Sequence, residues 1–322
     1  MPNLARGDRL CGRFTLMAKI GVGGHSEVWR ARDIVRREDV ALKILKRDPE
    51  SSGAWAVLEH EYAVAHELGH PGILKLYEPQ NCDGTLVLPM ALAPGGDLGV
   101  LRGEPYTRIV PALIEIAQAL EHAHGRGVVH RDLKPGNIFC DEGLVKIGDY
   151  GLSKFISCSR RSGQTESVGT VHYMAPEVAN GRYGKEIDVY ALGIILYQML
   201  AGKVPFHAET PHGLMYQHLD ARPPALRSIR PDLPPSLEPV LGKALAKRRE
   251  DRYPSASDLV RDLEHALQSP QRLPEESRID LPPARPGRTL DDDLHDQMLE
   301  DELMALAGTD EEADLQVTLP PT

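Results

Sequence analysis

The sequence has few cysteines and no paired cysteine motif. Its 322 residues include only Cys11, Cys82, Cys140 and Cys158, and no two of them form a CxxC pair. Such spacing is typical of neither a zinc site nor a disulfide framework. We therefore expect neither feature, and this cysteine usage favours a reducing compartment.

Segments for export, membrane insertion and nucleic-acid binding are also missing. The N-terminal stretch MPNLARGDRLCGRF has no apolar core, so we expect no signal peptide. The longest apolar run, VYALGIILYQMLAG, is shorter than the roughly 20 residues that a membrane helix needs. The formal net charge of −10 argues against a nucleic-acid binder. These absences predict a cytoplasmic chain with no membrane span and no nucleic-acid partner.

The acidic charge is confined to the C-terminal end. Residues 269–322 contain four Arg, no Lys and fourteen Asp or Glu, so they carry the whole net charge and the remainder is neutral. This Pro-rich and acidic segment has few aromatic residues and is predicted to be disordered. Within it, residues 294–307 place apolar side chains at helical spacing. Two interpretations stay open, a partly helical solvated tail or a segment that docks on its own chain or on a partner.

Residues 14–92 carry strand signals, and residues 106–268 carry mostly helix signals. A chain of this length with 41% hydrophobic residues can bury a substantial core. Alternating patterns predict strands at 14–23, 26–33, 38–46, 73–78 and 85–92, around a helix at 53–68. Further patterns predict helices at 106–127, 185–202, 234–246 and 255–268, and short strands at 137–140 and 144–149. The helix at 185–202 is apolar on nearly every side, so we expect it to be buried.

Two stretches of the strand-rich region suit phosphate binding. Gly21 and Gly23 lie between two strands, where glycine lets backbone amides approach phosphates, although most such strings are simple turns. A strand rather than a helix follows them, which favours a hairpin over a nucleotide and disfavours a dinucleotide fold. Lys43 ends the strand VALK, either as a strand-edge cation or as a phosphate ligand held by a carboxylate. On the next predicted helix, Glu61 is favoured over Glu59 as that carboxylate.

The stretch HRDLKPGNIF, residues 130–139, is either a salt-bridged turn or a catalytic loop. As a catalytic loop, Asp132 would accept a hydrogen bond from a substrate hydroxyl, and Lys134 would neutralise a transferred phosphoryl group. Asn137 could hold a metal through its amide oxygen, and Asp149 of GDYGL adds a carboxylate that suits Mg²⁺. Phosphoryl transfer depends mainly on positioning and charge neutralisation, and these side chains supply both.

The ordered series of these residues resembles the eukaryotic-type protein kinases. The series comprises Gly21, Gly23, Lys43, Glu61, Asp132, Asn137 and Asp149. The stretches MAPE, DVYALG and REDRYPSASDL extend the resemblance over roughly residues 10–268, and in it Arg252 is expected to pair with Glu177. The chain looks most like the bacterial serine/threonine kinases of this type.

This resemblance implies an α+β, bilobal protein kinase fold. A small antiparallel sheet with one helix and a short N-terminal extension is expected at 1–92, and a larger, mostly α-helical lobe at 93–268. The tail at 269–322 follows, with a short helix at 294–307 as one of its interpretations. ATP and Mg²⁺, with Mn²⁺ as an alternative, are the implied cofactors.

The resemblance also assigns roles to single residues. The implied nucleotide-binding residues are Gly21, Gly23, Ser26, Val28, Ala41, Lys43, Met90, Ala91, Ala93 and Phe139. The implied catalytic residues are Asp132, Lys134, Lys43 and Glu61, and the implied metal ligands are Asn137 and Asp149. Met90 falls at the gatekeeper position before the hinge. His130 and Asp188 are expected to hold the loop in place rather than to react.

Local departures and specificity signals leave the chemistry intact. Ser26 stands for the third glycine of the loop, Tyr150 for the usual Phe, and Tyr190 for a frequent Trp, and none of these changes removes a chemical group. Lys134 together with Thr170 is the serine/threonine pattern, which argues against a tyrosine kinase. The segment GTVHYMAPE argues against a small-molecule phosphotransferase.

Regulation is expected in the polar stretch before GTVHYMAPE. Arg131 marks, in the resemblance, kinases controlled by charge on the activation segment, and Lys154 is positioned to share its pocket. The candidate acceptors of a phosphate are Ser162, Thr165 and Ser167, with Thr170 as a further regulatory position. We expect Glu166 to replace a phosphate in part and phosphorylation of Thr165 to raise activity. A polar loop without autophosphorylation is the alternative.

Two functions compete at this stage. The first is transfer of the γ-phosphate of ATP to protein Ser/Thr hydroxyls, including the chain's own activation segment in a dimer formed during autophosphorylation. The second is a catalytically weak kinase-fold scaffold that binds nucleotide or a signalling partner. Loss of Lys43, Asp132 or Asp149 would indicate the scaffold, and all three are present. The expected partners are a protein substrate and a protein that binds the acidic tail.

Overall fold

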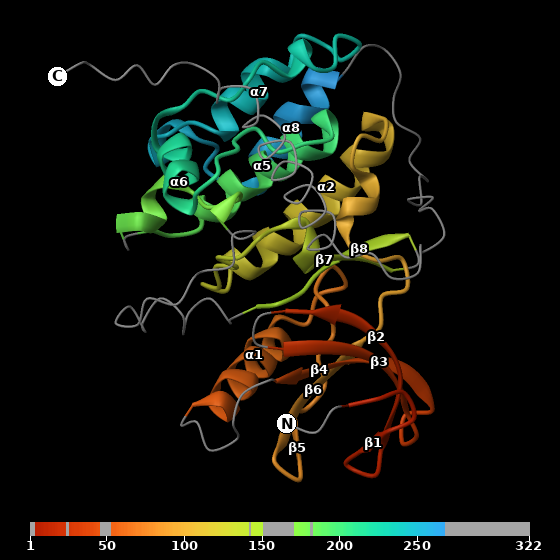
Figure 1. The fold of residues 1–322 in the computed structure, drawn as a ribbon. Coiled ribbons are helices and arrows are strands. Elements are labelled where there is room, and N and C mark those ends of the chain that lie inside the picture. The colour runs from red at the N-terminus through yellow and green to blue at the C-terminus, as the bar shows by residue number, and fades with distance from the viewer. Residues whose placement is uncertain are drawn as a thin grey trace, which may run out of the picture.

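The computed structural model describes residues 4–23, 26–45, 53–141, 143–150, 171–180 and 183–267. Within them, a six-stranded antiparallel sheet and one helix form the N-terminal part, and helices form most of the remainder (Figure 1). The predicted α+β protein kinase fold is confirmed. The predicted acidic tail and the predicted regulatory positions 154–170 lie outside the described residues.

The N-terminal sheet owes its position in the core to alternating side chains. Its strands are β1 (Arg9–Leu10), β2 (Phe14–Val22), β3 (Ser26–Asp33), β4 (Glu38–Leu45), β5 (Gln80–Cys82) and β6 (Thr85–Ala91), in the spatial order β1-β2-β3-β4-β6-β5. The central strand β4 is buried on both faces from Val40 to Leu45. Successive residues point to opposite faces of a strand. Lys43 therefore shares a face with Ala41 and Leu45.

One face of the sheet packs against helix α1 (Ala54–Leu68), which ends at Gly69 with a left-handed φ of 47°. A left-handed residue at this position is a frequent helix stop, and glycine adopts it without steric cost. The helix-facing cluster of buried apolar residues is Ala41, Leu45, Leu58, Ala65, Leu74, Leu76, Leu86, Leu88 and Met90. This packing orients α1 so that Glu61 points at the sheet face that carries Lys43.

The other face of the sheet encloses a second cluster without help from a helix. This strand-only cluster is Phe14, Leu16, Trp29, Ala31, Val40, Leu42, Ile44, Cys82 and Val87, with Leu4, Leu10 and Tyr77 packed against it. Every member comes from a strand or from a segment next to one. The sheet must therefore curl over its own face to keep these side chains from water.

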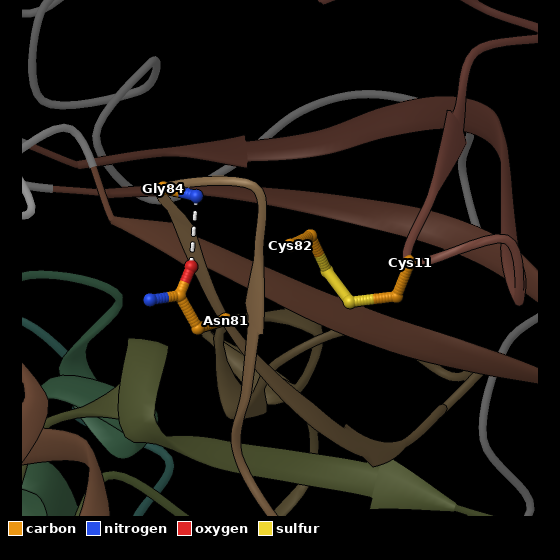
Figure 2. The surroundings of a disulfide bond; sticks show 4 residues. All are labelled: Cys11, Asn81, Cys82 and Gly84. Carbon is orange, nitrogen blue, oxygen red and sulfur yellow. Dashed lines mark hydrogen bonds between the residues drawn. A yellow bond between two sulfur atoms is a disulfide. The ribbon is translucent and has the colours of Figure 1, made fainter.

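A disulfide joins Cys11 to Cys82, and the prediction that the chain has no disulfide is wrong for this pair. Cys11 follows β1 and Cys82 ends β5, and these two strands are the opposite edges of the sheet. Their Cα atoms lie 4.7 Å apart, and Figure 2 shows the bond between the β5–β6 hairpin and the loop after β1. The pair could not be predicted from cysteine spacing, because the sequence separation is 71 and only the curled sheet brings the two cysteines together.

The expected strand at 73–78 is also a correction. Ile73 and Leu76 make only isolated bridges, and β6 pairs with β4 on one side and with β5 on the other. Strand β5 includes Asn81 and Cys82 of the stretch NCDG, whose residue types favour a turn. The turn itself is narrower, with Asp83 and Gly84 at φ of 50° and 87°. The Gly84 amide donates a 2.8 Å hydrogen bond to Asn81 Oδ1, which closes the hairpin beside the disulfide (Figure 2).

The helical part is assembled around α5, and its helices are α2 (Tyr106–His124), α5 (Glu186–Ala201), α6 (Pro211–Asp220), α7 (Leu237–Ala244) and α8 (Ala256–Leu267). Residues 187–200 of α5 are all buried, which confirms the predicted central helix. A Cβ on Gly193 would lie 2.9 Å from Ala244 Cβ, so α5 and α7 approach closely there. The sequence analysis missed α6, although Thr210 caps its start and Pro211 occupies its first turn.

A short hairpin, β7 (Ile138–Asp141) and β8 (Leu144–Ile147), lies between the sheet and the helices in Figure 1. The segment before β7 contains the 3₁₀ turn η2 (Pro135–Asn137), and the segment after β8 leads to Asp149. None of the helices in the described ranges is both long and apolar enough to cross a membrane.

Candidate active site

Lys43 joins the sheet, helix α1 and the segment after β8 at one point. Its Nζ lies 3.2 Å from Glu61 Oε1, and it also contacts Asp149 Oδ1. The Lys43 and Glu61 side chains are only 5% and 1% exposed. The pairing of Lys43 with Glu61 follows the sequence expectation, whereas the direct contact of Lys43 with Asp149 was not foreseen.

The charges at this point depend on one another. Burial opposes the charge of Lys43, but Asp149 and Glu61 outweigh it and raise the pKa of the lysine. Burial also works against the Asp149 carboxylate, yet the lysine charge lowers its pKa to about 2. Burial raises the pKa of Glu61 to about 8, against the attraction of Lys43 and with the help of the Asp149 charge. Asp149 is therefore the fully ionised carboxylate near neutral pH.

Asp132, Lys134 and Asn137 form one connected group on the loop before β7. The Asn137 Nδ2 amide donates 2.7 Å and 3.0 Å hydrogen bonds to the Asp132 backbone oxygen and to Asp132 Oδ2. The Lys134 Nζ lies 3.4 Å from the same Asp132 Oδ2. The Gly148 amide donates to the Asn137 backbone oxygen, which ties this loop to the residue before Asp149. The predicted loop residues thus lie together with the Lys43 ion pairs.

The buried helix α5 holds the loop through Asp188. Its two carboxylate oxygens accept hydrogen bonds of 2.8 Å and 2.9 Å from the backbone amides of His130 and Arg131. Asp188 Oδ2 also lies 2.8 Å from His124 Nε2. Arg131 has a left-handed φ of 72°, which is unfavourable for a residue with a side chain. The two accepted hydrogen bonds keep the loop in this conformation.

His130 is held by both of its ring nitrogens. Nε2 lies 2.8 Å from the Gly148 backbone oxygen, a pure acceptor, so Nε2 carries the hydrogen. Nδ1 then accepts a 3.3 Å hydrogen bond from the Asp132 amide. The ring also packs edge-on against Tyr150, with 4.7 Å between centroids. These contacts agree with the structural role expected for His130 and fix the backbone at Asp132.

The residues expected around a nucleotide base belong to one apolar cluster. Ala41 faces Met90 across the β4–β6 ladder, and Val28 and Phe139 pack against the same helix-facing cluster. The Ala91 amide already donates to the Lys75 backbone oxygen, 2.9 Å away, so hinge hydrogen bonds to a base must use other backbone groups nearby. These side chains form an apolar surface next to Lys43.

The glycine stretch turns between β2 and β3. Gly21 faces Val28 in the ladder, and the Gly23 amide donates a 2.8 Å hydrogen bond to the Ser26 backbone oxygen. Residues 24 and 25 lie outside the described ranges. A Cβ on Gly21 would meet Val28 Cβ at an ordinary 3.5 Å, so the fold itself does not demand glycine there. Close approach of a ligand is the remaining physical reason for it.

The donor set near Asp149 fits a hard divalent cation. Asp149 offers ionised carboxylate oxygens, and Asn137 offers an amide oxygen because its amide nitrogen is already used on Asp132. Mg²⁺ prefers a few oxygen ligands of this kind and keeps room for phosphates and water. Both predicted metal ligands thus fit the predicted cation.

The segment at 171–180 lies against the loop that contains Asp132. Asp132, Met174 and Ala175 line one small cavity there. Glu177 receives two hydrogen bonds, of 2.6 Å and 2.8 Å, from the buried guanidinium of Arg252, as the sequence predicted. Arg131 lies 5.6 Å from the ring centroid of Tyr183. The other predicted regulatory residues, Lys154, Thr165, Ser167 and Thr170, lie outside the described ranges.

One positioning residue escaped the sequence analysis. A Cβ on Gly148 would lie 2.8 Å from the Phe139 ring and 3.1 Å from Leu74, so only glycine lets Asp149 approach the sheet at this place. The signal was present in GDYGL, where a glycine stands directly before the acidic residue.

Comparisons with protein families, with known sequences and with solved structures agree with one another. A family described as the protein kinase domain matches residues 14–268. The serine/threonine-protein kinase PrkC of Bacillus subtilis is 33% identical over 271 residues, which cover 81% of this chain and 41% of PrkC. The serine/threonine-protein kinase PknF of Mycobacterium tuberculosis is 34% identical over 295 residues, which cover 87% of this chain and 61% of PknF. The chain thus spans only part of the length of these relatives.

A solved structure is similar over nearly its whole length. The kinase domain of PknI from M. tuberculosis aligns with a TM-score of 0.64 and 26% sequence identity. The alignment covers 82% of this chain and 98% of that domain.

Proposed function

Because the chain belongs to the protein kinase domain family, we propose that it transfers the γ-phosphate of ATP to serine and threonine hydroxyls of proteins. One observation carries the proposal. Lys43, from the sheet, contacts both Glu61 and Asp149, and Asp149 is linked through Gly148 to the loop that contains Asp132. Lys43 and the loop with Asp132, which come from distant parts of the chain, are therefore connected through Asp149, Gly148 and Asn137.

Each side chain has a task in this proposal. Lys43 binds the phosphates next to the transferred group, and Glu61 orients it through their buried hydrogen bond. Asp132 accepts the proton of the substrate hydroxyl and aims its oxygen at phosphorus. Lys134 stabilises the negative charge of the phosphoryl group in the transition state of its transfer. Asn137 and Asp149 would hold Mg²⁺, which neutralises phosphate charge when bound.

The apolar residues around Met90 serve to bind the base of ATP. Val28, Ala41 and Phe139 offer a surface for stacking, and backbone groups of the hinge from Ala91 to Ala93 supply hydrogen bonds. Gly21 and Gly23 let backbone amides approach the phosphates, and Ser26 completes that loop. The chain matches only 41% of PrkC and 61% of PknF. A protein substrate and protein partners for the whole protein are therefore part of this proposal.

A transfer assay with radiolabelled ATP and a protein acceptor tests the function. Wild type should label the acceptor, and Asp132→Asn should lower the rate by about 10²–10⁴-fold because it removes the proton acceptor. Asp141→Asn, on the neighbouring hairpin, is the matched control and should keep its rate. If wild type and Asp132→Asn both bind nucleotide but neither labels the acceptor above background, the scaffold function replaces this proposal; equal labelling by the two proteins would remove the role of Asp132.

Autophosphorylation and a cytoplasmic location extend the proposal. Thr165 is the preferred acceptor, with Glu166 supplying part of the charge beforehand. Mass spectrometry of protein incubated with ATP, together with the turnover of Thr165→Ala, tests this, and complete loss of turnover would remove the role of Glu166. Cell fractionation tests the location. The Cys11–Cys82 bond removes the argument from cysteine usage for a reducing compartment.

A further inference from the structure

We propose that Cys11 and Cys82 form a thiol–disulfide exchange site, and that its reduction by a dithiol loosens the sheet that carries the nucleotide-binding residues. The bond joins the two edges of the sheet, so it acts on the sheet as a whole and not on one turn. Figure 2 shows it linking the β5–β6 hairpin to the loop after β1. Both bridged segments are short, since β1 has two residues and β5 has three.

The bond closes an apolar face that is covered by no helix of the described residues. Cys82 is itself a member of the strand-only cluster and is 6% exposed. Leu4, which precedes β1, and Leu10, which belongs to β1, pack on the same cluster. A two-residue edge strand has few ladder hydrogen bonds of its own. Without the covalent link, we expect β1 and the residues around it to separate from the cluster first.

The two ends of the bond differ in access. Cys11 is exposed, whereas Cys82 is buried, so an incoming thiolate reaches the Cys11 sulfur first. Cys11 and Gly12 both have left-handed φ, of 50° and 60°. This conformation is unfavourable for cysteine and costs glycine little. Once the bond is cut, the loop after β1 can leave that conformation, which favours opening of the sheet edge.

The exchange balances in two steps. One thiolate of the dithiol attacks Cys11 Sγ and expels Cys82 as a thiolate, forming a mixed disulfide at Cys11. The second thiol of the reductant then displaces the Cys11 thiolate and closes its own disulfide. Two electrons and two protons pass from the dithiol to the protein, and both cysteines end as thiols.

The closed loop encloses the nucleotide-binding residues of the sheet. Gly21, Gly23, Lys43 and Glu61 all lie between the two cysteines in the chain. Strand β2 runs from the Cys11 side to the glycine stretch, and β6 runs from the Cys82 hairpin to Met90. Loosening the sheet edges therefore lowers the share of molecules in which these residues hold their places. The nucleotide read-out below rests on the proposed function, whereas the thiol and unfolding read-outs do not.

The first experiment maps the bond in the full chain. Air-oxidised protein is alkylated under denaturing conditions, digested and analysed by mass spectrometry before and after graded dithiothreitol treatment of the folded protein. We expect a Cys11–Cys82 cross-link that dithiothreitol removes and re-oxidation restores. Cys140, a buried free thiol, is the internal reference and should be alkylated in both states. Absence of the cross-link, or its survival until the protein is unfolded, would overturn the proposal.

The second experiment measures unfolding and nucleotide binding in both states. Reduction should lower the unfolding temperature by roughly 5–10 °C because the 71-residue closure is lost. The Kd for a fluorescent ATP analogue with Mg²⁺ should rise about three- to tenfold, because the apparent affinity falls with the competent fraction. Equal Kd values in the two states would sink the proposal, while failure of both states to bind nucleotide would sink the proposed function instead.

Two substitutions at one position separate the bond from the backbone. Cys11→Ser removes the bond and keeps the unfavourable left-handed conformation, so its Kd should match reduced wild type and ignore dithiothreitol. Cys11→Gly removes the bond but relieves the backbone, so its Kd should lie between the two states of wild type and also ignore dithiothreitol. A persisting response of either variant to dithiothreitol would place the redox effect elsewhere.

Discussion

The sheet part and the helical part of this molecule are stabilised in different ways. The helical part packs around α5, whose residues 187–200 are all buried in one large apolar cluster. The sheet part divides its apolar residues into the helix-facing cluster and the strand-only cluster. Helix α1 covers the first, and a curled sheet with a disulfide encloses the second.

The two parts also contribute different residues to the candidate site. The helical part fixes the loop of Asp132 through Asp188 of α5. The sheet part presents Lys43, whose partners come from outside its own strand. A large core resists local change, whereas two small clusters with separate closures can loosen one at a time. We therefore expect perturbations of the helical part to act on global stability, and those of the sheet part to act first on binding.

The largest expected effect comes from the buried ion pair of the helical part. Arg252 has a fully buried side chain, donates to Glu177 and also donates to the backbone oxygens of Ala246 and Lys247. Arg252→Ala should lower the free energy of unfolding by about 3–5 kcal/mol, since it removes a fully buried guanidinium and leaves Glu177 and the Ala246 and Lys247 backbone oxygens without their donor. Urea unfolding followed by circular dichroism measures this.

The sheet offers a matched pair for that substitution. Arg13 donates to both carboxylate oxygens of Asp33, but the Arg13 side chain is 21% exposed. Arg13→Ala should cost about 1–3 kcal/mol, because the buried Asp33 carboxylate keeps its hydrogen bonds from the Val35 and Arg36 backbone amides. A loss for Arg13→Ala as large as that for Arg252→Ala would remove the proposed contrast between the two parts.

A pair of glycine substitutions gives the next smaller effect. Gly193→Ala forces a Cβ to within 2.9 Å of Ala244 Cβ, and this overpacking costs about 1–3 kcal/mol, offset by up to about 1 kcal/mol of helix propensity. Gly21→Ala meets only an ordinary 3.5 Å contact and should change the free energy of unfolding by less than about 0.5 kcal/mol. Its effect should instead be a higher KM for ATP. Thermal unfolding and steady-state kinetics of both variants check the pair, and an unchanged KM for Gly21→Ala would contradict the role of that glycine.

A pH dependence of stability is expected in the sheet part, and it tests one of its buried groups without changing the packing. Burial raises the pKa of Glu61 to about 8, so the folded protein binds a proton that the unfolded chain releases near its ordinary pKa of 4.5. Wild type should therefore lose stability relative to Glu61→Gln as pH rises from 4.5 to about 8, and the difference should be constant above that range. Unfolding temperatures of the nucleotide-free proteins from pH 5 to 9 measure it.

The control for this pH series lies on the same helix. Glu59 is exposed, so Glu59→Gln should run parallel to wild type at every pH. A flat difference between wild type and Glu61→Gln would mean that Glu61 titrates near its ordinary value in the folded protein.

The sequence predicted what depends on local pattern and motif order. The helix at 185–202, the pair of Lys43 with Glu61 and the pair of Arg252 with Glu177 all lie where the motifs indicated. The missed features depend on how distant segments meet. Cys11 and Cys82 become neighbours only when the sheet curls, and β5 pairs with β6 where the local letters favoured a turn. Periodicity describes single elements and contains no information on which edges close upon one another.

The grip of Asp188 on the backbone of His130 and Arg131 has a consequence for how this protein can be tuned. Asp188 belongs to the buried helix α5. The position of the loop with Asp132 therefore depends on how α5 packs in the core, away from the site where a reactant would bind. Under the proposed function, a conservative change such as Ile195→Val, within residues that no reactant touches, should alter turnover while leaving the Michaelis constant for ATP in place. Substitutions in the core around α5 would thus change turnover, and substitutions in the sheet would change the affinity for ATP.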